Sequence, residues 1–229
     1  MTMPTRLSTI GDLERPDHHY LPIDAICYFW GEYTPYEYTD GEKWNFSPTN
    51  QLIANFKKSV DRKGRSEWNH KIRAIEEVSQ QFARFWKWED LVEEHRVALI
   101  PVPPSKARDD ALYDSRMADL LERIATHCGY QLDIRDCLTF SGINAASHNA
   151  VARPTPDELY AQLQFDDAIG KPGSAPGVIF VFDDMLTTGA HYVAVSRKLS
   201  EAFPGVPIVG NFIARRTIPN PFGEIDILI

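Results

Sequence analysis

The chain has 229 residues, and its 43% hydrophobic content with five tryptophans predicts a packed core. A formal net charge of −8 argues against broad binding of nucleic acid. No apolar run reaches transmembrane length, the N-terminus lacks a signal-peptide pattern, and Cys27, Cys128 and Cys137 have no metal-binding spacing, so we expect a cytoplasmic protein with reduced thiols.

The first 95 residues predict a loose polar arm followed by an aromatic-rich hood or cap. Residues 24–46 concentrate aromatic side chains, and Pro35 and the turn signal Asp40-Gly41 divide them. This pattern predicts a β-hairpin or a short antiparallel sheet. The aromatic side chains either stack on bases or pack a small lid, and lid packing is the interpretation that we favour.

Two helices are expected after this hairpin. Residues 47–50 are a helix-start signal before a short apolar stripe, and a longer stripe predicts a helix over about 69–91. Basic side chains crowd the connection over 57–65. They either contact a polyanion or form a solvated basic face, and we favour the solvated face.

From about residue 96 the pattern changes to strands alternating with helices, which predicts an α/β fold with a parallel sheet. The apolar residues 97–100 run into a tract of prolines that ends at Pro104. Proline cannot continue a central ladder, so this tract marks the carboxyl end of a strand. Ser105 and Lys106 follow on a loop.

A helix over 110–128 and a short strand over 131–134 come next, and Gly129 closes the helix. Residues 139–154 are polar and lack periodicity, which predicts a loop. A short helix over 155–165 begins with capping-box residues.

The most informative stretch is residues 178–190. Its first five residues are continuously apolar and β-prone, which predicts a strand buried on both faces of a parallel sheet. Asp183 and Asp184 follow, then the small, hydroxyl-rich turn 187–190, then a helix. Ligands of open α/β sheets bind beyond the carboxyl ends of the strands, and a helix N-terminus favours phosphate. Carboxylates there accept hydrogen bonds from sugar hydroxyls and help to hold hydrated Mg²⁺.

A last strand is predicted over 207–214. Arg215 and Arg216 lie at its carboxyl end. They serve an acceptor or a phosphate, or they are ordinary surface residues, and the sequence leaves these readings open.

Residues 178–190 resemble the phosphoribosyl-pyrophosphate (PRPP) motif of the type I phosphoribosyltransferases. A Walker B strand, the alternative, needs a Gly-x-x-x-x-Gly-Lys-Ser/Thr loop, which the sequence lacks. The resemblance implies that Asp183 and Asp184 are the catalytic acids, which serve the ribose and hold Mg²⁺ through water. The residues that it implies for PRPP binding are these two acids with Met185, Thr187, Thr188, Gly189, Ala190 and His191. The family usually has Ser or Thr where this chain has His191, so one hydroxyl contact with the phosphate is lost.

Two further segments resemble the same family. The proline tract with Pro104, Ser105 and Lys106 is similar to the pyrophosphate loop, and it is closest to the competence-associated (ComF-like) members. Residues 139–154 are similar to the flexible flap that closes over the reacting centre and excludes water. Arg116 would then point back to the pyrophosphate, and three more residues would meet it from around the flap, namely Arg135, His148 and Arg153. An ordinary surface loop is the alternative.

The resemblance implies a parallel-sheet type I phosphoribosyltransferase core over 96–229, with the arm and hood over 1–95. The implied activity is that of a pentosyl-transferring glycosyltransferase of nucleotide metabolism, which moves the phosphoribosyl group of PRPP to an unidentified acceptor and releases pyrophosphate with the help of Mg²⁺. Two alternatives remain: a sensor of PRPP or a nucleotide 5′-monophosphate without turnover, and an accessory module of a DNA-uptake or phage-defence system. Membrane and direct nucleic-acid partners are not expected, and a homodimer is left open.

Overall fold

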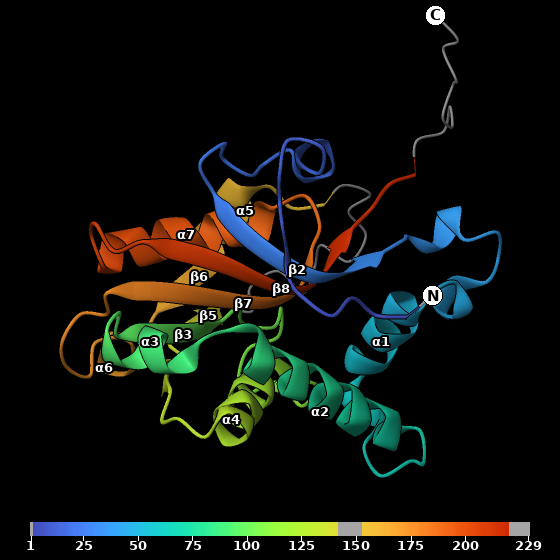
Figure 1. Ribbon diagram of the computed structural model, residues 1–229, viewed down its shortest axis with the longest axis horizontal. Coiled ribbons are helices and arrows are strands. Elements are labelled where there is room, and N and C mark those ends of the chain that lie inside the picture. The colour runs from blue at the N-terminus through green and yellow to red at the C-terminus, as the bar shows by residue number, and fades with distance from the viewer. Residues whose placement is uncertain (1, 142–152, 220–229) are drawn as a thin grey trace, which may run out of the picture.

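The computed structural model describes residues 2–141 and 153–219 and has an α/β architecture (Figure 1). Its centre is a six-stranded sheet in the order β1-β2-β8-β7-β3-β4. All neighbouring strands pair in parallel except β1 and β2, which are antiparallel. The prediction of an α/β fold with a mostly parallel sheet is therefore confirmed. The strands are β1 (Ser8–Thr9), β2 (Ile26–Tyr33), β3 (Val97–Pro101), β4 (Asp133–Ile134), β7 (Val178–Leu186) and β8 (Ile208–Arg216).

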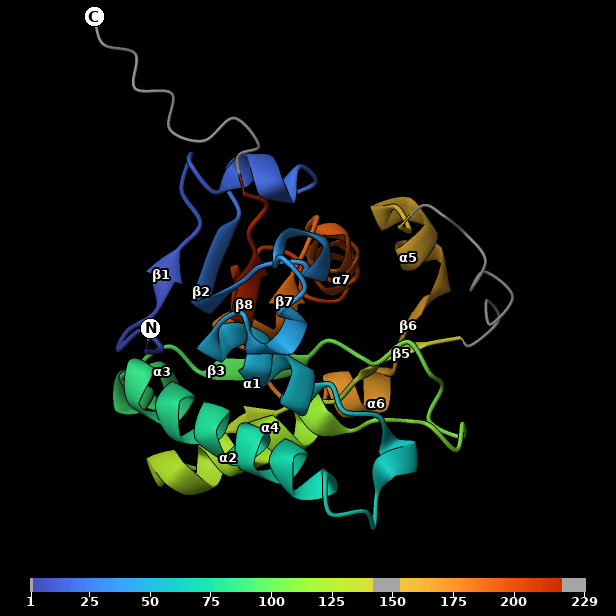
Figure 2. The same cartoon turned by 90° about the vertical axis from the view of Figure 1, so that its right-hand side faces the viewer.

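Helices cover both faces of this sheet, as Figures 1 and 2 show from two sides. One face carries α5 (Pro156–Gln162) and α7 (Ala190–Ala202), and the other carries α1 (Pro48–Phe56), α2 (Trp68–Phe85), α3 (Trp88–Glu93) and α4 (Arg116–Cys128). A separate ladder pairs β5 (Leu138–Phe140) with β6 (Leu163–Phe165). The short elements are α6 (Asp167–Gly170) and the 3₁₀ helices η1 (Arg15–His18), η2 (Tyr36–Tyr38), η3 (Lys43–Asn45) and η4 (Val60–Arg62).

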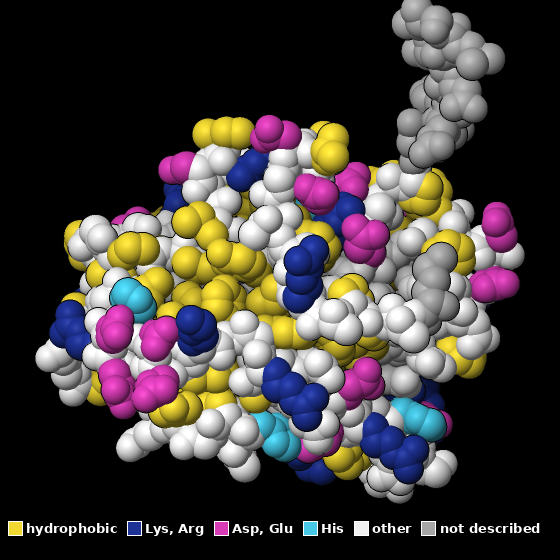
Figure 3. All heavy atoms as spheres, viewed as in Figure 1, with side chains coloured by type: hydrophobic (Ala, Val, Ile, Leu, Met, Phe, Trp, Pro, Cys, Tyr) yellow, Lys and Arg dark blue, Asp and Glu magenta, His cyan; other side chains and the backbone are white. Residues whose placement is uncertain are grey.

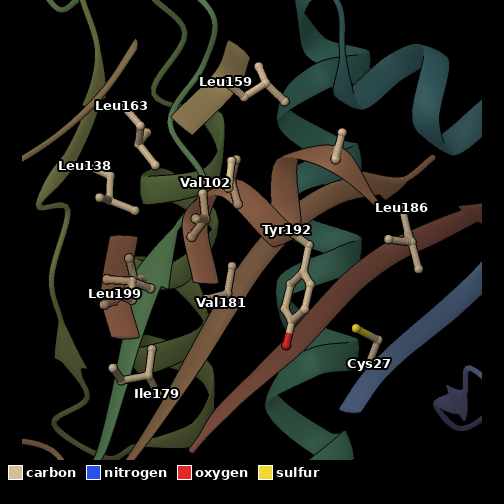
Figure 4. Packing of buried hydrophobic residues seen from close by; sticks show 14 of the residues in the cluster. Cys27, Val102, Leu138, Leu159, Leu163, Ile179, Val181, Leu186, Tyr192 and Leu199 are labelled. Carbon is tan, nitrogen blue, oxygen red and sulfur yellow. The ribbon is translucent and has the colours of Figure 1, made fainter. Parts of the chain in front are cut away.

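Each face of the sheet has its own hydrophobic core. On the α7 face, Val181 of β7 packs with Tyr192 and Leu199 of α7, and Cys27 of β2 lies beside them (Figure 4). Full burial of a side chain of this size stabilises the fold by roughly 1.5–3 kcal/mol. Two-sided burial explains why β3 and β7 read as continuous apolar runs rather than as alternating patterns.

The ends of β3 and β7 align at one edge of the sheet. Pro101 pairs with Phe182, and the backbone N–H of Val102 donates to the carbonyl of Phe182 at 2.8 Å. The expectation that the proline tract and the acids meet at the same edge is therefore confirmed. The β7 strand also runs further than predicted, through both acids to Leu186, because Leu186 still pairs with Arg215 of β8.

The predicted hairpin over 24–46 is wrong. These residues form the single strand β2, parallel to β8 in the central sheet, and then η2 and η3. Phe29 is buried in the core of the α7 face and Trp30 in the core of the opposite face. A strand that is buried on both faces lacks the alternation of polar and apolar residues seen in a hairpin. A high aromatic content occurs in both kinds of strand, so it could not distinguish a central strand from a hairpin.

Three helix boundaries also differ from the prediction. The short helix expected over 155–165 ends at Gln162, because residues 163–165 pair with β5 as strand β6. The long helix expected over 69–91 is divided into α2 and α3 by Trp86, whose backbone is extended. The helix expected from residue 110 begins only at Arg116, because the chain before it forms turns in which the Asp110 carboxylate accepts from the backbone N–H of Leu112.

Within the described part of the chain, no helix is long and apolar enough to cross a membrane. Acidic and basic side chains both appear on the face that Figure 3 shows, rather than one sign alone.

Candidate functional site

The candidate site lies at the edge where β7 and β3 end. Asp184 is 4% exposed and points to the face that carries α1 and α4. Lys57, the residue that follows α1, places its Nζ 2.9 Å from Asp184 Oδ1. Arg116, the first residue of α4, donates from Nη2 to Asp184 Oδ2 at 2.7 Å and from Nε at 3.1 Å. Both oxygens of this carboxylate are therefore paired with cations.

The two acids have opposite pKa shifts. Burial raises the pKa of Asp183 to about 7, with a further contribution from the negative charge of Asp184. Burial also acts to raise the pKa of Asp184, but the charges of Lys57 and Arg116 outweigh burial and leave this pKa lowered. Near neutral pH the pair thus holds one fixed negative charge on Asp184 and one carboxyl, Asp183, that titrates.

A chain of alternating charges continues from Arg116 away from the sheet. Its Nη1 lies 2.8 Å from Asp114 Oδ2, and Lys71 Nζ lies 2.6 Å from the same oxygen. Lys71 is only 2% exposed and also donates to the carbonyl of Lys58 at 2.8 Å. Burial lowers the pKa of Lys71, and the Asp114 carboxylate opposes this shift. The network links α2, the residues before α4 and the end of β7 through consecutive ion pairs.

Sequence reasoning missed most of this network. Lys57 belonged to a basic connection that we interpreted as a solvated face, and its 37% exposed side chain instead reaches a buried acid. Lys71 and Asp114 carry no local signal, because each is an ordinary charged residue until the fold brings the two together. Of the residues in this network that surround Asp184, Arg116 alone was expected near the acids.

The turn after β7 has the form expected of an anion-binding loop. Gly189 has φ of 89° and precedes α7, a conformation that glycine adopts without strain. The Ala190 N–H lies 3.4 Å from Thr188 Oγ1. Within residues 2–141 and 153–219, the backbone N–H groups of Thr188 and Gly189 donate to no hydrogen-bond acceptor. Thr188 is 7% exposed and Gly189 is buried, and unpaired N–H groups at a helix N-terminus favour an anion.

The carbonyl side of this turn is covered by the N-terminal arm. The Nδ1 of His18 contacts the carbonyl of Thr187, and the N–H of Tyr20 donates to the carbonyl of Thr188 at 3.0 Å. Leu21 packs so closely on Gly189 that a Cβ there would lie 2.9 Å from its Cγ. The arm, predicted to be loose, is therefore anchored here against the loop.

His191 and Met185 lie beside the acids in different ways. His191 is half-buried in the first turn of α7, and its ring meets Phe140 edge-on at 6.1 Å between centroids. Burial lowers the pKa of His191, which keeps its imidazole neutral near pH 7. Met185 packs instead on the core of the α4 face, so its side chain serves packing.

The predicted pyrophosphate loop lies at the correct edge, and its lysine pairs with Asp110 rather than with the acids. Pro104 is half-buried and Ser105 is exposed. Lys106 places its Nζ 3.6 Å from Asp110 Oδ2, a pair with both side chains about one third exposed. Arg116 and Lys57, rather than Lys106, supply the cations at the acids.

The structure describes two of the three residues predicted around the flap, Arg135 and Arg153, and gives them different surroundings. Arg135 is 4% exposed, and its guanidinium pairs with Asp133 at 2.6 Å and donates to the carbonyl of Gly170 at 2.8 Å. Gly170 precedes β7, so Arg135 serves the opposite edge of the sheet from the acids. His148 lies outside the described residues. Arg153 is exposed and close enough to Arg216 for their charges to interact.

The edge thus combines the buried Asp184, its half-buried neighbour Asp183, two cations and a turn whose backbone N–H groups are unpaired among the described residues. Among the described residues, no group of three or more His, Cys, Asp and Glu side chains is arranged to hold a metal ion. No protein-family model and no curated protein matches the chain. The function is therefore argued from the chemistry of this edge.

Proposed function

We propose that the chain binds PRPP and acts as a type I phosphoribosyltransferase, transferring the phosphoribosyl group to an acceptor with release of pyrophosphate. The observation that carries the proposal is one continuous segment, Asp183 to Ala190. It delivers two acids at the end of a central parallel strand and then a glycine turn with unpaired N–H groups at the start of α7. A ribose beside a phosphate needs this combination of acceptors and donors.

Each part of the segment has a separate task in this proposal. The N–H groups of Thr188 and Gly189, with the N-terminus of α7, bind the 5′-phosphate. The Asp183 carboxylate accepts hydrogen bonds from the ribose hydroxyls, because an ionised carboxylate is an acceptor only. These contacts fix the ribose for displacement at C1, so catalysis proceeds by positioning and charge stabilisation.

The acids fit Mg²⁺ only through water. Asp184 already has both oxygens paired with cations, and one oxygen of Asp183 accepts from the N–H of Asp184 at 2.7 Å. The remaining oxygen of Asp183 would meet a water of a hydrated ion that enters with the pyrophosphate group. Bound there, Mg²⁺ would neutralise charge on the leaving pyrophosphate.

Lys57 and Arg116 supply the protein's own positive charge at this edge. Arg116 is held on two sides, by Asp184 and by Asp114, and stays in place. Among the described residues, the Lys57 side chain is paired with Asp184 alone, and it is 37% exposed. Lys57 is thus the cation able to exchange its carboxylate for an incoming pyrophosphate oxygen.

A second candidate function is PRPP or nucleotide sensing without turnover. Two observations favour it: the acid that would face the ribose beside Asp183 is already neutralised, and the N-terminal arm is fastened over the phosphate turn. In a sensor, ligand binding would release these contacts and change the hood rather than drive transfer.

Pyrophosphate release separates the two candidates. The protein is incubated with PRPP, Mg²⁺ and a panel of nitrogen-heterocyclic acceptors, and released pyrophosphate is measured alongside the shift of Tm with PRPP alone. Transfer predicts both a raised Tm and acceptor-dependent release, and sensing predicts the raised Tm alone. An unchanged Tm at millimolar PRPP would refute both.

A further inference from the structure

We propose that the carboxyl ends of β2 and β8 form a second binding site, for a planar ring that carries a carboxylate, and that this ring is the acceptor. The inference deepens the proposed function and rests on it, because an acceptor must lie beside bound PRPP. Its central residues are Arg216, Tyr33 and Arg153.

Strand register brings this site next to the phosphate turn. Arg215 pairs with Leu186, so Arg216 is level with Thr187, the first residue of the turn. On its other side Arg216 pairs with Tyr33 of β2. Neighbouring strands lie about 4.8 Å apart, so Tyr33, Arg216 and the turn are successive neighbours along one edge.

Arg216 has binding capacity that the described residues do not use. Its Nε is buried and has no hydrogen-bond partner among them, and neither does the buried Thr217 Oγ1 beside it. The hydrogen bond that its guanidinium makes within the described part of the chain is from Nη2 to the carbonyl of Asp17, at 3.3 Å. Arg215 differs, because both Glu32 and Asp17 take its guanidinium. Buried N–H groups are nearly always paired, so the free edge of Arg216 points to a ligand that accepts from it.

A second cation makes an anion the expected ligand. Burial and the charge of Arg153 lower the pKa of Arg216, so the two guanidinium groups are close enough to repel each other. The acids nearby are Asp17 and Glu37, and Asp17 Oδ2 is already taken by Arg215 and the N–H of Ile218. A carboxylate between the two arginines would relieve the repulsion and match the planar fork of Arg216.

Aromatic side chains at the same end of β2 favour a flat ligand. The rings of Tyr33 and Tyr36 lie 6.2 Å apart between centroids, tilted by 39°. Tyr36 and Tyr38 are 40% and 44% exposed, so their rings remain open to a partner. Arg153 also acts on Tyr33, which puts the cation and the aromatic surface together. A flat ring stacked on tyrosine with its carboxylate on arginine satisfies both features.

The test compares carboxylates with their neutral counterparts. The Kd values of nicotinate against nicotinamide, and of orotate against uracil, are measured by calorimetry with the full chain saturated with ribose 5-phosphate and Mg²⁺. Ribose 5-phosphate carries no pyrophosphate to displace, so the ring binds without reacting, and PRPP is titrated in a separate experiment. At least one carboxylate is expected to bind about tenfold or more tightly than its counterpart, since a hydrogen bond to a charged group is worth that much. Arg216→Gln should abolish this preference, and Arg216→Lys should retain part of it.

Arg73→Gln is the matched control, because Arg73 is exposed on α2 and its loss removes the same charge. It should leave the preference intact. Equal binding of carboxylates and neutral rings, or no binding of either, would overturn the inference, while PRPP binding in its separate titration would leave the proposed function standing. If Arg216→Gln weakens PRPP as much as the carboxylate, Arg216 belongs to the PRPP phosphate and the acceptor assignment fails. Circular dichroism and Tm verify that each variant is folded.

Discussion

Replacement of Asp183 by Asn should stabilise the ligand-free protein at alkaline pH. Burial raises the pKa of this carboxyl to about 7, and the unfolded chain titrates an aspartate near 3.9. Between these values the folded state binds the proton more tightly, so stability falls as pH rises from about 4 to about 7. Asparagine keeps the shape and cannot ionise, so it removes this loss.

The size of the effect follows from the shift. The shift of about three pKa units, at 1.36 kcal/mol each, limits the stability that the wild type loses on ionisation of Asp183 to about 4 kcal/mol. The full loss is reached only above pH 7. Asp184 contributes with the opposite sign, because its lowered pKa gives stability above the unfolded value near 3.9 that is lost as pH falls. The Asp183→Asn variant should therefore still lose stability as pH falls below about 4, because Asp184 is protonated there. It should no longer lose stability as pH rises from about 4 to about 7.

Urea unfolding at pH 5, 6, 7 and 8 measures this directly. The wild type should become less stable across the series relative to Asp183→Asn, with the difference largest at pH 8. Asp184→Asn is the contrasting variant, because it leaves Lys57 and Arg116 without their carboxylate and should destabilise by about 3 kcal/mol. A constant difference between wild type and Asp183→Asn at all four pH values would refute the assignment of the raised pKa to Asp183.

Lys71→Met should lower the free energy of unfolding by about 3 kcal/mol in urea, because it leaves a carboxylate short of its buried partner. Lys63→Met, at an exposed position, should change the free energy of unfolding by less than about 0.5 kcal/mol. Equal effects of the two substitutions would show that the Lys71–Asp114 pair does not stabilise the fold. Gly189→Ala should cost about 1–3 kcal/mol more than Gly129→Ala, since both glycines have positive φ but only Gly189 meets Leu21. Equal Tm losses in the two variants would show that the arm does not press on the turn.

The strand and turn of the site could be predicted because their signals are local. Five apolar residues, two acids and a glycine turn occupy one short segment, and each part keeps its meaning without knowledge of the rest of the fold. The same holds for Thr155, whose capping box with Glu158 is present as expected.

The partners of the acids could not be predicted, because they come from distant segments. Lys57 and Arg116 meet Asp184 only after α1 and α4 have packed on one face of the sheet. Strand β2 was missed for a related reason: its residues face two cores, and no periodicity indicates which strand it will join. Long-range pairing of this kind is set by packing rather than by local pattern.

Titration of PRPP with Mg²⁺ by calorimetry, at pH 6 and pH 8, tests the central claim that Asp183 to Ala190 bind a ribose phosphate. The wild type should bind PRPP more tightly at pH 8, where Asp183 is ionised and accepts hydrogen bonds from the ribose hydroxyls. Asp183→Asn, although more stable, should bind about tenfold or more weakly at pH 8, and its Kd should change less than that of the wild type between the two pH values. Unchanged affinity in this variant, or the absence of any binding by the wild type, would contradict the claim.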